Sequence, residues 1–281
     1  MKTLIVQGLC EDNISASDLK QFWKPCMATV KQWAELNGYD YRYFSDKRND
    51  DFDVTSWNLN YRRQNEITTT KNQFRKLQWM DGWTDYDWLF WVDSDCYIYG
   101  NPMPFNFENS RKPTLWFLNN EITLKRWHRP NMSVWGGNQL LVQDAVDWAR
   151  YQFEHPWDQD EIVQALRCFN KYPTTKDAPP ERVLDHGLRY TTEIPAFTEE
   201  IFMIGFTQSK LGNTVKLLEE GMGFSSIGKG ARSWTADSII HFGGVNKLRD
   251  LTRFRAWKAY MAYIGETAPK DYDDDFTYNE I

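Results

Sequence analysis

Short apolar runs alternate with helical patterns along most of the chain. Apolar or alternating runs of strand length occur at residues 3–7, 39–44, 88–92, 114–118, 139–143 and 238–242. Apolar residues recurring at three and four positions predict helices at 19–36, 66–81, 144–153, 159–169, 197–206, 213–220 and 249–264. Gly38 is expected to end the first helix, which Pro25 would kink. This alternation predicts an α/β fold with a mostly parallel sheet flanked by helices.

Composition and charge narrow the class of protein. The 281 residues are 41% hydrophobic, enough to bury a full core. The sequence shows no apolar run long enough to span a membrane and no recognisable signal peptide. Four widely spaced cysteines favour reduced thiols. The net charge of −6 comes largely from five acids in the last eleven residues, so the rest of the chain is nearly neutral and a polyanionic partner remains open.

Two carboxylates follow directly after the most apolar run. The segment 88–92 ends at Asp93-Ser94-Asp95, so both acids are expected at the carboxyl end of a strand, where α/β sheets bind ligands. Carboxylates at positions i and i+2 can converge on a hard divalent cation such as Mg²⁺ or Mn²⁺ if the chain turns there. Taken alone, the tripeptide is more typical of a polar turn after a strand.

A second segment whose residues could bind a ligand or a metal lies near the end of the chain. It is His241-Phe242-Gly243-Gly244, followed by Lys247. The histidine can complete the coordination of a metal, and a glycine lets the backbone approach a pyrophosphate. The lysine can neutralise that pyrophosphate. In isolation, the segment also fits a core histidine beside a Gly-Gly turn.

Together these segments resemble the DxD region and the HFxGxxK signature of GT-A glycosyltransferases. The glycogenin-type enzymes and the plant galactosyl- and xylosyltransferases of galactomannan and xyloglucan look most similar. Two further elements match in order, Lys76-Leu77 and Asp158-Gln159-Asp160. The resemblance covers roughly residues 3–258. It departs at Leu248-Arg249, where the family has Pro-Trp, and at segments 45–65 and 171–235, which have no identified counterpart.

The resemblance implies a single GT-A (Rossmann-like) domain over residues 1–265, with a nucleotide-binding part at 1–100 and an acceptor part at about 101–240. Residues 266–281 would be an acidic tail. The implied enzyme is a metal-dependent, retaining hexosyltransferase that uses a nucleoside-diphosphate sugar and a hydroxyl acceptor, with a UDP-sugar favoured as the donor and a glycan or polysaccharide favoured as the acceptor. Without a recognised leader or anchor, a bacterial or viral-host cytoplasm is the expected location.

The resemblance also assigns roles to individual residues. Asp93, Asp95 and His241 would hold Mn²⁺ or Mg²⁺. The nucleotide-sugar would contact Gln7, Gly8, Lys76, Ser94, Gly244 and Lys247. Asp158 and Gln159 would be catalytic, although Asp158 also suits a helix N-cap. Asn138 and Gln139 would contact the acceptor or the sugar.

Two alternatives remain open at this stage. A phage-type glycosyltransferase acting on hydroxymethylated bases in DNA would use basic residues and aromatic platforms. The basic clusters are Lys247, Arg249, Arg253, Arg255 and Lys258, and Arg62, Arg63, Lys71, Arg75 and Lys76; the candidate platforms are Trp57, Trp127, Trp135, Trp157 and Trp234. The other alternative is a non-enzymatic calcium-dependent carbohydrate-binding module. Donor sugar, acceptor and oligomeric state stay open.

Overall fold

A computed structural model describes residues 1–11, 14–45, 75–103, 113–121, 128–154, 215–218, 224–226, 238–242 and 246–264. In chain order the elements are β1 (Thr3–Leu9), α1 (Ala16–Asp18), the π-helical segment η1 (Leu19–Trp23), α2 (Lys24–Leu36), β2 (Asp40–Ser45), β3 (Trp88–Val92), β4 (Cys96–Tyr99), β5 (Leu115–Glu121), β6 (His128–Asn138), α4 (Gln139–Glu154), β7 (Val215–Leu218), β8 (Phe224–Ser226), β9 (Ser238–His241) and α8 (Lys247–Tyr263). Residues 75–79 are also helical.

The described strands form two sheets. The larger sheet has the order β2-β1-β3-β6-β5-β7, and the smaller has the order β4-β9-β8. In the larger sheet β1 runs parallel to β2 and β3, and β5 runs parallel to β7, whereas β6 is antiparallel to both β3 and β5. The predicted α/β class, with a mostly parallel central sheet flanked by helices, is therefore confirmed.

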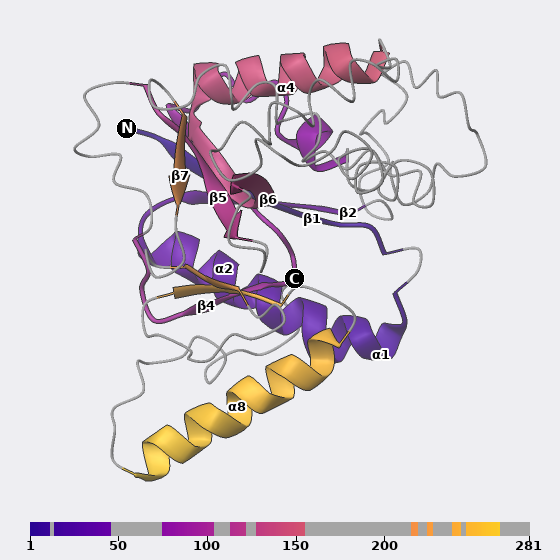
Figure 1. Cartoon of the computed structure of the whole chain (residues 1–281), viewed down its shortest axis with the longest axis vertical. Helices are drawn as coiled ribbons and strands as arrows, with labels where there is room; N and C mark the ends of the chain where they lie inside the picture. Colours follow the sequence, from indigo (N-terminus) through magenta and orange to yellow (C-terminus); the bar gives the residue numbers. More distant parts are fainter. Residues whose placement is uncertain are drawn as a thin grey trace, which may run out of the picture.

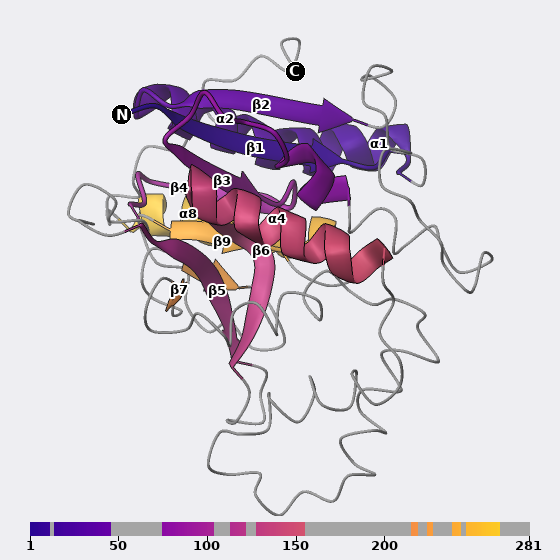
Figure 2. The ribbon, with the colours of Figure 1, turned by 90° about the horizontal axis from the view of Figure 1, so that it is seen from above.

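The larger sheet is covered on both faces. Figure 1 shows α4 above it and α2 below it, and in Figure 2 its strands run down the picture from β2 to β5 behind α4. The alternation of β3 explains this arrangement, because successive side chains point to opposite faces. Leu89 and Trp91 pack with α4, whereas Trp88 and Phe90 pack with α2. The whole strand is consequently buried.

The smaller sheet lies between α2 and α8. Ile98 of β4 joins the core formed with α2. Tyr97 and Tyr99, which alternate with it, pack against Phe254 of α8 with ring centroids 5.3 Å apart in both pairs. Figure 1 places α8 at the bottom of the molecule, far from α4. This second core holds the end of β9 in place, and that end carries His241, a residue of the candidate site.

Local sequence explains the first helical region. Ser15 caps it, since the Ser15 hydroxyl accepts a hydrogen bond from the Asp18 amide at 3.0 Å. Pro25 lies at the start of α2, directly after η1, within a run of helical residues that continues from Ala16 to Leu36. Gly38 follows α2 with φ of 70°, as expected for a glycine that ends a helix.

Two sequence predictions were wrong about the type of element. Residues 139–143 begin helix α4 instead of forming a strand, because the Asn138 side chain accepts a hydrogen bond from the Leu140 amide and caps the helix. Residues 213–220 were expected to be helical, but Val215–Leu218 form strand β7. That strand pairs with the edge of the larger sheet, and this pairing overrides the local pattern.

The predicted helices at 159–169 and 197–206 and the acidic tail at 266–281 lie outside the described residues. So do most of segments 45–65 and 171–235.

Candidate functional site

Asp93 stands where β3 ends, and its backbone is held by neighbouring strands. The Asp93 amide donates a hydrogen bond to the Ser133 carbonyl of β6 at 2.6 Å. Its own carbonyl accepts hydrogen bonds from the Gln7 side chain at 3.2 Å and from the Cys96 amide at 2.9 Å. The chain therefore turns at residues 93–95 in a fixed geometry, as the spacing of the two acids requires for convergence.

Asp95 and His241 meet where the first strand of the smaller sheet begins and its partner ends. Cys96 of β4 pairs in antiparallel register with His241 of β9. The Phe242 amide then donates to the Asp95 carbonyl at 3.0 Å. The imidazole Nε2 of His241 lies 3.5 Å from Asp95 Oδ1 and 3.2 Å from the Ser133 hydroxyl.

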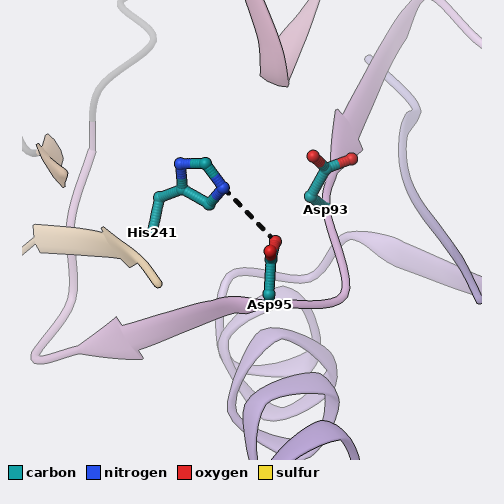
Figure 3. Close-up of side chains that lie close together, drawn as sticks. All are labelled: Asp93, Asp95 and His241. Carbon is teal, nitrogen blue, oxygen red and sulfur yellow. Dashed lines mark ion pairs between the residues drawn. The ribbon is translucent and has the colours of Figure 1, made fainter. Parts of the chain in front are cut away.

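Asp93, Asp95 and His241 form one cluster. Each offers a ligand atom within 4.8 Å of the others, and in the part of the chain that the structure describes this is the one such group of three. Figure 3 shows the three side chains pointing into a common space from the end of β3, the start of β4 and the end of β9. The three residues predicted to hold a metal are therefore brought together.

Two lysines from distant segments reach the same carboxylates. Lys76 Nζ lies 3.2 Å from Asp93 Oδ1, and its residue is only 8% exposed. Lys247, in the first turn of α8, pairs with Asp95 Oδ2 and lies over the ring of Trp23 at 5.2 Å from the centroid. Each acidic ligand therefore has its own lysine.

The charges shift the pKa values of the buried pair. Burial by itself would raise the pKa of Asp95, but the charges of His241 and Lys247 outweigh it and hold that pKa well below its usual range. Burial would lower the pKa of His241, yet the Asp95 carboxylate raises it above the ordinary 6.5. Asp95 is therefore ionised over the physiological range, as a metal ligand must be.

The residues present fit a hard divalent cation. Two carboxylates and one imidazole are a donor set suited to Mn²⁺ or Mg²⁺. Asp95 Oδ1 is buried and accepts no hydrogen bond from the described residues. A buried carboxylate oxygen without a donor is costly, and a bound cation would satisfy it.

The other predicted donor-binding residues line the same edge of the sheet where they are described. The Ser94 hydroxyl donates to the Gly8 carbonyl at 2.5 Å, so the turn after β3 is tied to the end of β1. The buried Gln7 side chain donates to Asp93 and accepts from the Tyr41 hydroxyl at 2.9 Å. Burial and the nearby Tyr43 and Glu35 raise the pKa of Tyr41, which therefore stays protonated as the donor.

Asn138 and Gln139 lie elsewhere. Asn138 pairs with Trp88, at the amino end of β3, and the Gln139 amide donates to the Asp87 carbonyl at 3.0 Å. The length of β3, at about 3.4 Å per residue, separates them from Asp93 by roughly 17 Å. The structure does not bring these two residues to the cluster of Asp93, Asp95 and His241, and their predicted contact with acceptor or sugar stays a prediction.

Three predicted site residues, Asp158, Gln159 and Gly244, lie outside the described residues. Of the five proposed aromatic platforms only Trp135 is described, and for it the expectation was wrong. Trp135 is fully buried on β6 and stacks on Phe117 with ring centroids 5.8 Å apart. The polar residues and glycines of this segment suggested a loop, but Trp135 lies within strand β6.

The sequence missed two residues of the site. Trp91 donates its indole N–H to Asp93 Oδ1 at 2.5 Å, and the spacing i to i+2 on one strand could have indicated this contact. Ser133 contacts His241 from β6, and no local pattern connects two residues so far apart.

The residues of the predicted basic clusters lie in different environments in the folded protein. Lys76 and Lys247 turn toward the carboxylates, whereas Arg249 and Arg253 pair with Asp250 on the surface of α8, at 3.5 and 3.7 Å. Arg62, Arg63 and Lys71 lie outside the described residues. Among the residues that are described, no helix combines the length and the apolar composition needed to cross a membrane.

Comparison with known proteins gave likenesses in structure alone. No protein-family model matches the chain, and no curated protein sequence matches it. Among solved structures, 49 chains match. One is a glycosyltransferase involved in the glycosylation of the major capsid of PBCV-1, with 13% identity over 91% of this chain and 100% of that one, and a TM-score of 0.44. Another is the galactosyltransferase LgtC in complex with donor and acceptor sugar analogues, with 7% identity over 90% of this chain and 95% of that one, and a TM-score of 0.42.

Proposed function

We propose that the protein is a GT-A glycosyltransferase that transfers a hexose from a nucleoside-diphosphate sugar to a hydroxyl group, with Asp93, Asp95 and His241 holding Mn²⁺ or Mg²⁺. UDP is the proposed nucleotide, and a glycan or polysaccharide is the proposed acceptor. One observation carries the proposal. Two carboxylates, a histidine and two lysines from four separate segments meet beyond the end of β3, with Lys247 reaching Asp95 across 152 positions of sequence.

The charges of this cluster suit a diphosphate. When bound, the cation supplies Lewis-acid stabilisation of the negative charge that develops on a departing nucleoside diphosphate. Asp93, Asp95 and His241 fix where that charge is neutralised, because their backbones are tied to β6 and to one another. Lys247, with a side chain 26% exposed, can turn from Asp95 to a phosphate oxygen. Lys76 is more deeply buried and keeps Asp93 in place.

Asp158, Gln159 and Gly244 keep their proposed roles on the strength of the sequence resemblance alone. Asp158 is proposed to serve the reacting sugar, with retention of configuration, and Gly244 to approach the diphosphate. The DNA-modifying alternative gains no specific support, because only part of its basic surface is described and two of those lysines face the carboxylates.

A calcium-dependent carbohydrate-binding module fits the cluster less well. Ca²⁺ takes six to eight oxygen ligands, whereas this cluster offers two carboxylates and an imidazole nitrogen. A lysine paired with each carboxylate also has no purpose in a site that only holds calcium, since each ammonium group opposes the cation. Both features favour a site that binds a cation together with an anionic ligand.

Release of nucleoside diphosphate from a panel of UDP-, GDP- and TDP-sugars, with Mn²⁺ or EDTA, tests the proposal. We expect hydrolysis or transfer with one nucleotide, lost in EDTA, and Asp95→Asn should reduce it by about a hundredfold or more because the variant loses a metal ligand. Asp81→Asn is the matched control, since Asp81 pairs with Arg150 away from the cluster. Equal rates for wild type and Asp95→Asn in limiting Mn²⁺ would exclude the metal assignment.

A further inference from the structure

One aromatic residue of the core touches a proposed metal ligand directly. The indole Nε1 of Trp91 donates a hydrogen bond to Asp93 Oδ1 at 2.5 Å, although Trp91 is 2% exposed and belongs to the core under α4. The contact follows from the strand geometry, because residues two apart on a strand point to the same face. The wide indole can therefore reach the carboxylate that continues its own strand.

The ring of Trp91 is held in place by a stack of aromatic side chains. Trp79 lies parallel to it, with ring centroids 6.0 Å apart and planes 17° apart. Phe44 of β2 in turn stacks on Trp79, with ring centroids 5.8 Å apart and planes 8° apart. A side chain at position 8 would overlap the Trp79 ring, so glycine at the end of β1 leaves the space that the stack occupies. The indole N–H consequently has one fixed direction.

The hydrogen bonds to Asp93 are concentrated on one of its two oxygens. Oδ1 accepts from both Trp91 and Lys76, the latter at 3.2 Å. Within the described residues Oδ2 accepts no hydrogen bond and is left for the space shared with Asp95 and His241. The two donors differ in charge. Trp91 orients the carboxylate without opposing a cation, whereas the ammonium group of Lys76 orients it and also repels a cation.

We propose that Trp91 is a positioning residue of the metal site: its indole N–H fixes the Asp93 carboxylate so that the free oxygen faces the cation. This inference rests on the proposed function, because it takes Asp93 to be a metal ligand. Partners that orient metal ligands typically contribute a factor of 10 to 100 to metal affinity. Trp91 acts through Asp93 and need not touch donor, acceptor or cation.

Mn²⁺ binding by the full chain, measured by calorimetry and by the electron paramagnetic resonance signal of free Mn²⁺, tests the inference. Trp91→Phe removes the indole N–H and keeps an aromatic ring against Trp79. Trp33→Phe is the matched control, because Trp33 is equally buried and donates its indole N–H to the Pro102 carbonyl at 3.0 Å, away from the cluster. We expect Trp91→Phe to weaken Mn²⁺ binding about tenfold and Trp33→Phe to leave it unchanged.

The outcomes separate this inference from the proposed function. If wild type binds Mn²⁺ and Trp91→Phe binds it equally well, the positioning role is wrong and the metal site stands. Equal weakening in both variants would also overturn the role, because it would reflect a general loss of core packing. If wild type shows no saturable Mn²⁺ binding, the metal assignment fails and the role of Trp91 fails with it.

A second measurement serves if Trp91→Phe does not fold. Wild type labelled with ¹⁵N-tryptophan can be titrated with Mg²⁺, and the Trp91 indole resonance can be assigned through its contacts with the Trp79 ring. We expect this resonance to shift on Mg²⁺ binding while that of Trp33 stays in place. A stationary Trp91 resonance in a protein that binds Mg²⁺ would overturn the positioning role.

Discussion

Lys247 and Asp95 show how individual residues balance the charge of this site. Asp95 is buried between the imidazole of His241 and the ammonium group of Lys247. A divalent cation entering the cluster meets this ammonium group as a competitor for the same carboxylate. A diphosphate bound with the cation gives the lysine another anion. The pairing therefore favours cation and diphosphate binding together over cation binding alone.

Replacing Lys247 by Met should therefore have opposite effects on two ligands. We expect Mn²⁺ without nucleotide to bind the variant about three- to tenfold more tightly, on the order of 1 kcal/mol for a partly exposed pair. UDP in the presence of Mn²⁺ should bind more weakly. Calorimetry measures both affinities, with Arg253→Met, on the same helix, as the control. Unchanged or weaker Mn²⁺ binding in the absence of nucleotide would contradict this competition.

His241 predicts a pH dependence of stability in EDTA. Burial alone would lower its pKa, but Asp95 raises it above 6.5 in the folded state. A raised pKa means that the folded state holds the proton more tightly, so this stabilisation is fully present below pH 6.5 and is lost as the pH rises through the folded-state pKa.

Urea unfolding of wild type and His241→Gln between pH 5.5 and 9 measures this contribution. The stability advantage of wild type over the variant should shrink as the pH rises. An advantage that stays constant, or that grows with pH, would show that the ion pair with Asp95 does not hold the proton on His241.

At the scale of elements, the pairing of β6 with β3 positions the turn that carries both acids. Gly136 of β6 has φ of 151° and faces Phe90 across the pair. A Cβ atom there would overlap the Leu89 carbonyl and lie 2.6 Å from Phe90 Cα. Backbone atoms of a central strand cannot move away as the end of a side chain can. This close approach therefore requires glycine.

Gly136→Ala should lower the free energy of unfolding by about 3 kcal/mol or more, through overpacking and an unfavourable φ. Gly38→Ala is the control, because Gly38 also has positive φ, of 70°, but has open space around it. We expect this control to cost only about 1 kcal/mol. Denaturant unfolding measures both, and equal losses would show that the strand pairing tolerates a side chain at position 136.

The sequence predicts the elements that carry strong local patterns. The five apolar residues of β3 and the bounds of α8 are found almost as expected, and the acids after β3 are found at the predicted edge. Strand β4 was missed because it is four residues long and directly follows Asp95. Strand β6 was missed because Pro130 and two glycines interrupt its pattern, and its bonds are made with distant strands.

The sequence predicts only those site residues that belong to recognisable motifs. Asp93, Asp95 and His241 were predicted because each lies in a recognisable segment, and the structure brings the three side chains together. The indole of Trp91 and the hydroxyl of Ser133 act through contacts that exist only after folding. The apolar run 88–92 indicates a core position for Trp91, which it also occupies, and a strand pattern alone cannot distinguish a core ring from one that also donates a hydrogen bond.

At the scale of the whole molecule, the site joins the two sheets. Asp93 ends a strand of the larger sheet, whereas Asp95 precedes the first strand of the smaller sheet and His241 ends its central strand. A cation bound by all three residues therefore connects both sheets. Because it binds the folded state, Mn²⁺ should raise the unfolding temperature, and UDP should raise it further only when the cation is present.

Calorimetric titration of UDP into wild type, once with saturating Mn²⁺ and once with EDTA, measures whether this cluster binds the nucleotide through a cation. We expect saturable binding with Mn²⁺, and at least a tenfold weaker affinity in EDTA, because the cation and Lys247 hold the diphosphate together. Asp95→Asn should resemble the EDTA result even with Mn²⁺ present. UDP binding of equal affinity with and without Mn²⁺, or none under either condition, would contradict the claim that this cluster is a metal-dependent nucleotide-sugar site.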